Sequence, residues 1–150
     1  MRSVETSKRK IPTKHKIKEY WKRRIVEMKK DIFNSIDHLE QGDFCFACGL
    51  LTNNHTERAH IIARVSGGTD NVDNLHLLCS ICHKDSELFE GDRYFEWFKN
   101  RNHVDAIMSI LYKYDYGLFK TFIEEAEKNS IDIYSISFLN SFNALRRTSF

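Results

Sequence analysis

The sequence predicts an α+β fold, in which a β-hairpin and a helix form a small core flanked by helical extensions at both ends. Three observations favour this class. Two Cys-x-x-Cys pairs frame a segment that contains two short strand-like runs and a glycine-rich turn. Apolar residues recur at helical spacing both before and after that segment, as in helices with one buried face. The 150 residues suggest one compact domain, or a small core with an appendage.

The N-terminal part is strongly basic. Residues 1–30 contain twelve Lys or Arg and three Glu, a local charge of +9, so the other 120 residues sum to −7 within the overall +2. We expect a flexible basic arm over residues 1–13. Pro12-Thr13 predicts the start of a basic amphipathic helix over 14–41, ended by Gln41-Gly42. Such a region attracts phosphate groups, and a solvated, helix-promoting surface is the alternative.

The central part, residues 42–100, is expected to carry the hairpin and its helix. Apolar patterns and turn residues predict a first cysteine knuckle over Phe44 to Leu51, a strand over Glu57 to Ala63, a loop over Arg64 to Asp73, a second strand over Leu75 to Leu78, and a helix from around Ser80 to near Gly91. The two cysteine knuckles would fix the base of this hairpin.

Residues 101–150 are expected to form a helical extension, with breaks at Gly117 and at Asn129-Ser130. Three apolar stripes keep helical spacing: Ile107, Ile110, Leu111 and Tyr114; Leu118, Phe119, Phe122, Ile123 and Ala126; Phe138, Leu139, Phe142 and Leu145. Core packing is the simplest interpretation of these stripes, and a platform for base stacking is the alternative.

The four cysteines predict a structural zinc site. A gap of two residues lets both thiolates of a pair reach one metal, and Cys45, Cys48, Cys79 and Cys82 supply four ligands for a tetrahedral centre. No apolar run reaches membrane length, and the first residues lack the apolar stretch of a signal peptide. We therefore expect a cytoplasmic protein without a membrane partner, where thiols are metal ligands more often than disulfides.

Polar residues stand at fixed places inside this cysteine frame. The motif elements are His60-Ile61, Gly67-Gly68, Asn74-Leu75 and the run from Leu78 to His83. Their order and spacing resemble the HNH (ββα-metal) endonuclease family, in its zinc-stapled form with two Cys-x-x-Cys pairs and a following His. The resemblance covers the segment from Cys45 to Glu87.

This resemblance implies a metal-dependent endonuclease that hydrolyses phosphodiester bonds, most simply in double-stranded DNA. Relatives act in restriction, homing, phage packaging and anti-phage defence. The family pattern makes His60 the general base, Asn74 the residue that positions it, and His83 a ligand of a catalytic Mg²⁺ or Mn²⁺. Histidine suits the first task because its ordinary pKa lies near neutrality.

The chain departs from the family pattern at Ala59, where many members place a metal-binding Asp or His. A second ligand beside His83 should therefore exist. Glu87 follows His83 by four residues and so shares its helical face, and hard cations favour carboxylate oxygen. Asp85 and Glu57 are the alternatives.

Cations near the motif are expected to contact nucleic acid. Arg58 and Arg64 flank the His60 strand, and a guanidinium matches phosphate oxygens in a bidentate manner. Lys22 and Arg23 offer charges on the N-terminal helix. Each of these residues could equally be an ordinary surface charge.

Ala59 also supports a rival interpretation, a non-catalytic zinc-stabilised module that binds nucleic acid. The retention of His60, Asn74 and His83 favours the enzyme, because folding around zinc requires none of them. The helical extension suggests a homodimer interface or a target-recognition element. RNA remains open as an alternative substrate.

Overall fold

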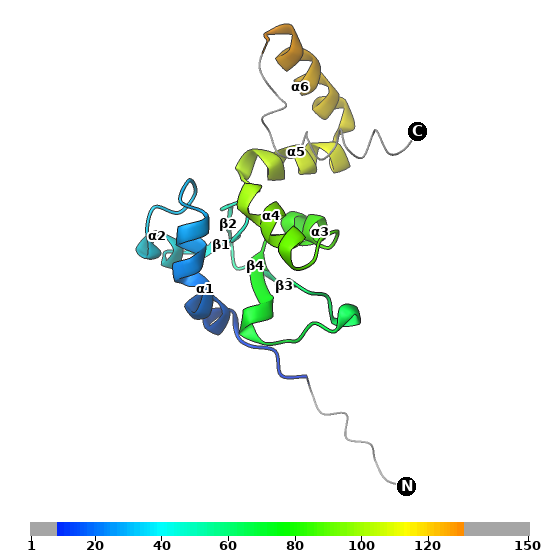
Figure 1. Ribbon diagram of the computed structural model, residues 1–150. Coiled ribbons are helices and arrows are strands. Elements are labelled where there is room, and N and C mark those ends of the chain that lie inside the picture. Colours follow the sequence, from blue (N-terminus) through cyan, green and yellow to red (C-terminus); the bar gives the residue numbers. More distant parts are fainter. Residues whose placement is uncertain (1–8, 131–150) are drawn as a thin grey trace.

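The computed structural model describes residues 9–130 and confirms the α+β class. Six α-helices and two two-stranded sheets make up this part of the chain (Figure 1). In chain order the elements are α1 (Lys14–Met28), α2 (Ile36–Glu40), β1 (Asp43–Phe44), β2 (Leu51–Thr52), β3 (Glu57–His60), the 3₁₀ turns η1 (Arg64–Ser66) and η2 (Val72–Asn74), β4 (Leu75–Leu78), α3 (Ser80–Ser86), α4 (Asp92–Asn100), α5 (His103–Tyr114) and α6 (Tyr116–Lys128).

The second sheet is the expected hairpin. Strands β3 and β4 are antiparallel, with Glu57 opposite Leu78 and His60 opposite Leu75. The strand predicted to reach Ala63 ends at His60. One further backbone hydrogen bond continues the pairing, from the Ile61 amide to the Asn74 carbonyl at 2.9 Å. Beyond it the chain leaves the hairpin to form the long β3–β4 loop, so His60 stands at the end of a strand.

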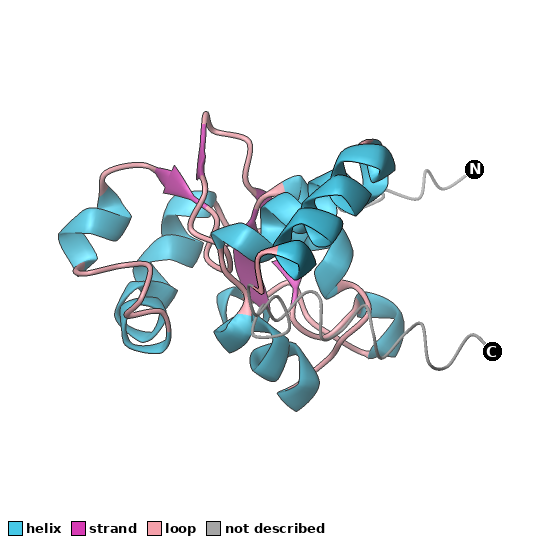
Figure 2. Ribbon diagram, turned by 90° about the horizontal axis from the view of Figure 1, so that it is seen from above, coloured by secondary structure: helices cyan, strands magenta, loops and turns pink. Residues whose placement is uncertain are grey.

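Helices lie on several sides of these short strands when the molecule is seen from above (Figure 2). All four residues of β4 are buried, because α1, α3 and β3 pack around it. On α1, the buried residues Ile17, Trp21 and Ile25 face this core, as their helical spacing predicts. The indole of Trp21 donates to the Val72 carbonyl at 2.7 Å and so ties α1 to η2.

His76 belongs to this core and not to a site. It is fully buried, its Nδ1 lies 2.7 Å from the Tyr94 hydroxyl, and aromatic rings of α1 and α4 surround it. Burial lowers the pKa of His76 to about 3, because a charged imidazolium cannot be hydrated there. The ring is therefore neutral at physiological pH and serves packing.

The prediction of one helix over residues 14–41 is wrong in its continuity. The helix begins as expected, with the Thr13 hydroxyl accepting from the Lys16 amide, but α1 ends at Met28 and α2 begins only at Ile36. The break lets the buried Lys29 ammonium donate to the carbonyls of Phe98 and Arg101, at 2.6 and 2.5 Å. These carbonyls end α4 and have no partner of their own in that helix.

Two further boundaries differ from the predicted ones. Helix α3 ends at Ser86, whose hydroxyl donates to the His83 carbonyl at 2.7 Å and competes with the helical ladder. Gly91, at φ 60°, then turns the chain into α4. The break between α5 and α6 falls at Asp115 and not at Gly117, because the Asp115 carboxylate accepts from the Leu118 amide and caps α6.

The C-terminal helices pack on each other at the end of the molecule opposite the N-terminal segment (Figure 1). Their small cluster contains Met108, Phe119 and Ala126, with Leu111 and Ile123 packed against it. The packing interpretation thus holds for part of the two stripes only, because their members Ile107, Tyr114, Leu118 and Phe122 are exposed. The third stripe, at 138–145, lies outside the described residues. The homodimer expected from this extension stays a prediction. Among residues 9–130, none of the helices is long and apolar enough to cross a membrane.

Candidate active site and metal centre

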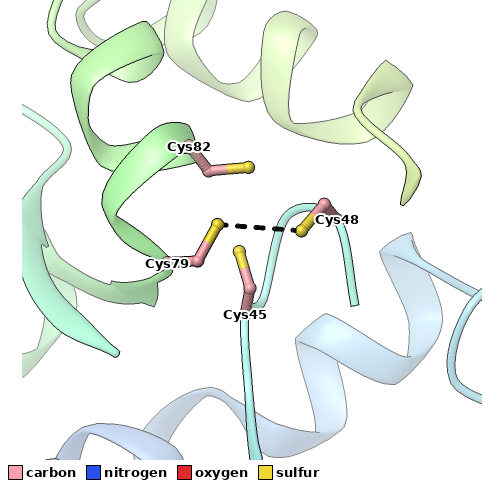
Figure 3. A group of neighbouring side chains, drawn as sticks. All are labelled: Cys45, Cys48, Cys79 and Cys82. Carbon is pink, nitrogen blue, oxygen red and sulfur yellow. Dashed lines mark hydrogen bonds between the residues drawn. The ribbon is translucent and has the colours of Figure 1, made fainter. Parts of the chain in front are cut away.

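The four cysteines converge on one buried point. Cys45 and Cys48 come from the turn between β1 and β2, and Cys79 and Cys82 come from the start of α3 (Figure 3). Their sulfur atoms all lie within 4.8 Å of one another, and none is in a disulfide. The Sγ atoms of Cys48 and Cys79 are 3.9 Å apart, close to the ~3.8 Å expected for tetrahedral Zn–S bonds of ~2.3 Å. The ligand set therefore fits zinc.

Backbone contacts hold the first cysteine pair in place. The Gly49 amide donates to the Cys45 carbonyl at 2.9 Å, and Gly49 adopts φ 75°, a conformation that favours glycine. The Phe46 amide donates to the Leu77 carbonyl of β4 at 2.8 Å. The knuckle is thus attached to the same strand that leads into the second cysteine pair.

Two buried cations lie in the electrostatic environment of these thiols. Lys29 and Arg101 are 0% and 4% exposed, and both interact with cysteine sulfurs. The Arg101 guanidinium also donates to Asp85 at 2.7 Å. Four thiolates on one Zn²⁺ leave a formal charge of about −2, and a buried charge requires partners. Lys29 and Arg101 supply them from the end of α1 and the end of α4.

His60 is paired with a carboxylate that the sequence analysis did not select. Its Nε2 lies 2.8 Å from Oδ1 of Asp70, in the β3–β4 loop. Hydrogen bonds from Arg9 and then from His60 hold the pKa of Asp70 far below its ordinary value. An ionised carboxylate can only accept hydrogen bonds, so His60 donates its Nε2 proton to Asp70. The neutral ring then carries its lone pair on Nδ1.

Two guanidinium groups approach the same carboxylate. Arg9 donates from Nε and Nη2 to the two oxygens of Asp70, both at 2.5 Å, and its Nη2 lies 3.5 Å from His60 Nε2. The Arg64 Nε lies 3.9 Å from Oδ1 of Asp70. The only sequence feature that could have pointed to Asp70 is its place just after the Gly67-Gly68 turn. No sequence feature distinguishes Arg9 from the other cations of its arm.

Asn74 closes the loop that contains Asp70. Its side-chain oxygen accepts from the Ile62 amide at 2.9 Å, and its Nδ2 donates to the carbonyls of Ile62 and Thr69 at 2.9 and 2.8 Å. A Cβ atom at Gly68 would meet the Ile62 carbonyl oxygen at 1.8 Å and Asn74 Nδ2 at 2.9 Å. The glycine therefore permits the close approach on which this set of hydrogen bonds depends.

We expect Asn74→Ala to loosen this loop. The substitution removes three part-buried hydrogen bonds, each of which contributes roughly 0.5–1.5 kcal/mol to stability. Thermal unfolding and amide exchange of residues 61–74 would measure the effect. Asn71→Ala is the matched control, because Asn71 is exposed and its side chain makes no capping bond. Equal melting temperatures and equal exchange in the two variants would contradict this account of Asn74.

His83 lies on α3, between two carboxylates. Its Nδ1 is 3.2 Å from Glu57 Oε2 on β3, and its Nε2 is 3.9 Å from Glu87 Oε1, one helical turn later. The Glu57 side chain is 43% exposed and that of Glu87 is 68% exposed. Asp85, an alternative from the sequence, instead binds Arg101, Ser109 and Lys113, so its carboxylate is engaged elsewhere.

Ala59 is fully buried. Strand alternation puts it on the same face of β3 as Glu57, two residues earlier, and β3 contacts α3. Glu57 therefore places a carboxylate on the face of β3 that also contains the buried Ala59.

The structure does not join all the predicted residues into one contact network. Within residues 9–130, no hydrogen bond or ion pair links His60 to His83, and each histidine has its own carboxylate. In the same part of the chain the cysteines form the one group of three or more metal-ligating side chains whose ligand atoms converge. The His83–Glu57 pair alone would give a divalent cation two protein ligands, leaving positions for water and phosphate oxygens.

The four cations predicted to contact nucleic acid differ in whether their charge is already paired within the protein. Arg23 is exposed, whereas Lys22 is ion-paired with Glu19 and Glu40 at 2.9 and 2.8 Å. Arg58 donates from Nε to the Pro12 carbonyl at 2.9 Å. Arg64, 54% exposed, stands next to Asp70. Of the four, Arg64 is the one that lies within 4 Å of Asp70, the carboxylate bonded to His60.

Comparison with known proteins agrees with this geometry. The family model described as HNH endonuclease matches residues 45–87, the segment that contains the four cysteines, His60, Asn74 and His83. Neither the curated proteins nor the solved structures gave a significant match. The segment from Cys45 to Glu87 thus matches the HNH endonuclease family, and its four cysteines are spaced as in the zinc-binding form of that motif.

Proposed function

We propose that the protein is a divalent-metal-dependent endonuclease that hydrolyses phosphodiester bonds of DNA. One observation carries this proposal. Inside the segment matched by the HNH family, His60 stands at the end of a strand with its Nε2 bonded to the ionised Asp70. This arrangement leaves Nδ1 as a proton acceptor, which a purely structural histidine does not need.

In the proposed reaction, His60 Nδ1 takes a proton from water as the water oxygen bonds to phosphorus. The bond from phosphorus to the 3′-oxygen breaks, and the 3′-oxygen leaves. Asp70 holds the ring in the required tautomer and stabilises the imidazolium that forms. Positive charge from Arg64 lies beside this pair and favours the anionic phosphate.

His83 and Glu57 would hold the divalent cation, in place of the ligand that Ala59 cannot provide. When bound there, the cation would offset the charge of the transition state and of the leaving oxygen. Their ligand atoms lie 3.2 Å apart, so both can face one ion. Imidazole suits Mn²⁺, Co²⁺ and Ni²⁺ better than Mg²⁺, which prefers oxygen ligands. Glu87, 3.9 Å from the other ring nitrogen, is the alternative partner.

The test is cleavage of supercoiled plasmid DNA by the zinc-loaded protein with Mg²⁺, Mn²⁺, Co²⁺, Ni²⁺ or EDTA. We expect nicked or linear products that require a divalent cation and disappear with EDTA. Intact plasmid in every metal, together with DNA binding that is indifferent to metal, would replace this proposal with the non-catalytic zinc module. The buried alanine at position 59 is the observation that favours that second function.

The same assay separates the two carboxylates. Glu57→Gln is expected to raise the Mn²⁺ concentration that gives half-maximal cleavage by at least about 10–100-fold, because the loss of even an outer-shell partner of a metal ligand costs that much. Glu87→Gln makes the same chemical change on the same histidine and should shift it less than threefold. The reverse order of the two variants would assign Glu87 as the ligand.

A further inference from the structure

Residues 9–13, the described part of the basic arm, contact β3 and the β3–β4 loop and pass the lower end of this hairpin in Figure 1. Arg58 of β3 donates to the Pro12 carbonyl at 2.9 Å, and Thr13 caps α1 directly afterwards. Helix α1 is itself tied to η2 by the hydrogen bond from Trp21 to Val72. The course of residues 9–13 is thus set by contacts on both sides, and Arg9 precedes the helix cap by four residues.

This path of the chain places Arg9 next to His60. The guanidinium lies with Nη2 at 3.5 Å from His60 Nε2, and its Nε and Nη2 donate to both oxygens of Asp70. A guanidinium has five N–H donors in a fixed plane, so at least two remain for another acceptor. The Arg9 side chain is 41% exposed, and those donors can meet a ligand from solvent.

The local charge favours an anion at this position. Arg9 and Arg64 both face Asp70, so with a neutral His60 the group has an excess of one positive charge. Asp70 restrains the Arg9 guanidinium before a ligand arrives, which lowers the entropy lost on binding. A phosphodiester, with one negative charge and two free oxygens, matches both the charge and the fork of the guanidinium.

We propose that Arg9, from outside the HNH segment, is a phosphate-binding residue of the active site that holds the phosphodiester beside His60. The proposal rests on the proposed function for its ligand. Asp70 has two roles in it, since it accepts from His60 and fixes Arg9 in one orientation. The basic arm then contributes a specific donor to the reaction as well as general attraction for DNA.

An opposite role would use the same contacts. If the arm were a strap that blocks His60, removing Arg9 would expose the base and increase cleavage. The exposure of Arg9 and its free donors favour binding over blocking, and the two roles predict changes of opposite sign.

The experiment compares Arg9→Gln and Arg9→Lys with Lys10→Gln in the full chain. Lys10 is exposed and its substitution removes the same charge one residue away, so Lys10→Gln controls for general electrostatics. Cleavage of plasmid DNA with Mn²⁺ gives kcat and KM. Anisotropy of a fluorescent DNA duplex in EDTA gives affinity without chemistry, for each variant at the same salt concentration.

We expect Arg9→Gln to lower kcat/KM by about 100-fold, the range for loss of one preorganised donor to a transition-state anion. Lys10→Gln should change it less than threefold, and Arg9→Lys should recover part of the loss. In EDTA, Arg9→Gln should weaken duplex binding more than Lys10→Gln does.

Three results would overturn the proposal: equal binding and cleavage in the two Gln variants, faster cleavage by Arg9→Gln, or full activity of Arg9→Gln. Should the wild type cleave no DNA, the nuclease proposal fails. Selective loss of binding in Arg9→Gln would then still support the phosphate site, and equal binding would refute it.

Discussion

We expect the Cys82→Ser variant to lose zinc binding and to unfold. Structural zinc contributes roughly 10–16 kcal/mol of apparent binding free energy at neutral pH, whereas a whole domain is stable by only about 5–15 kcal/mol. The Cys82 thiol is fully buried among the other three, and a serine hydroxyl is a poor substitute for a thiolate. We expect loss of bound zinc and of the cooperative thermal transition.

The measurements are zinc content by mass spectrometry and thermal unfolding by circular dichroism. Chelation of wild-type zinc should produce the same unfolded state. Ser80→Ala is the control, because Ser80 is exposed between the two cysteines, and it should keep one zinc per chain. If Cys82→Ser also retained one zinc per chain with an unchanged melting temperature, the four-cysteine centre would be refuted.

His60→Ala is expected to lower the cleavage rate by about 10²–10⁴-fold, the usual contribution of a general base. Its side chain is 24% exposed and pairs with Asp70 at the surface, so the melting temperature and zinc content should hardly change. His55→Ala is the matched control, because His55 is exposed on the loop that leads into the same strand, and we expect it to keep wild-type activity.

Plasmid cleavage by the two variants under the same conditions is the measurement. A His60→Ala variant that keeps the wild-type rate would show that another group accepts the proton.

The sequence predicted the parts of the fold that depend on local spacing. Two Cys-x-x-Cys pairs specify their own geometry, and the apolar run of β4 has the same bounds in the structure, Leu75–Leu78. The start of α1 followed from Thr13 as a cap. In each case the determining residues are close together in the sequence, so the pattern contains the necessary information.

The features that escaped prediction depend on partners far apart in the chain. The helix break after Met28 serves a hydrogen bond between Lys29 and Arg101, 72 residues later. The Arg9–Asp70 contact spans 61 residues. Helical periodicity continues through Lys29 without a signal, and one Arg among many cations has no distinguishing neighbour. The helix break and the Arg9 contact are determined by tertiary contacts, and these cannot be read from a single sequence.

The site is also larger than its motif. The HNH match covers residues 45–87, but Arg9 reaches His60 from the N-terminal segment and Arg101 reaches the thiols from the end of α4. A fragment limited to the motif would lack both, together with the α1 face that covers β4.

His83 directly follows Cys82, so a single peptide bond connects the ligand of one metal to the proposed ligand of another. The first turn of α3 that presents His83 is the turn that the zinc centre closes. Loading of the two ions should therefore be hierarchical: the thiolate centre fills first, and only then does the second position exist. A newly made chain would then gain the proposed nuclease activity only after it had acquired zinc.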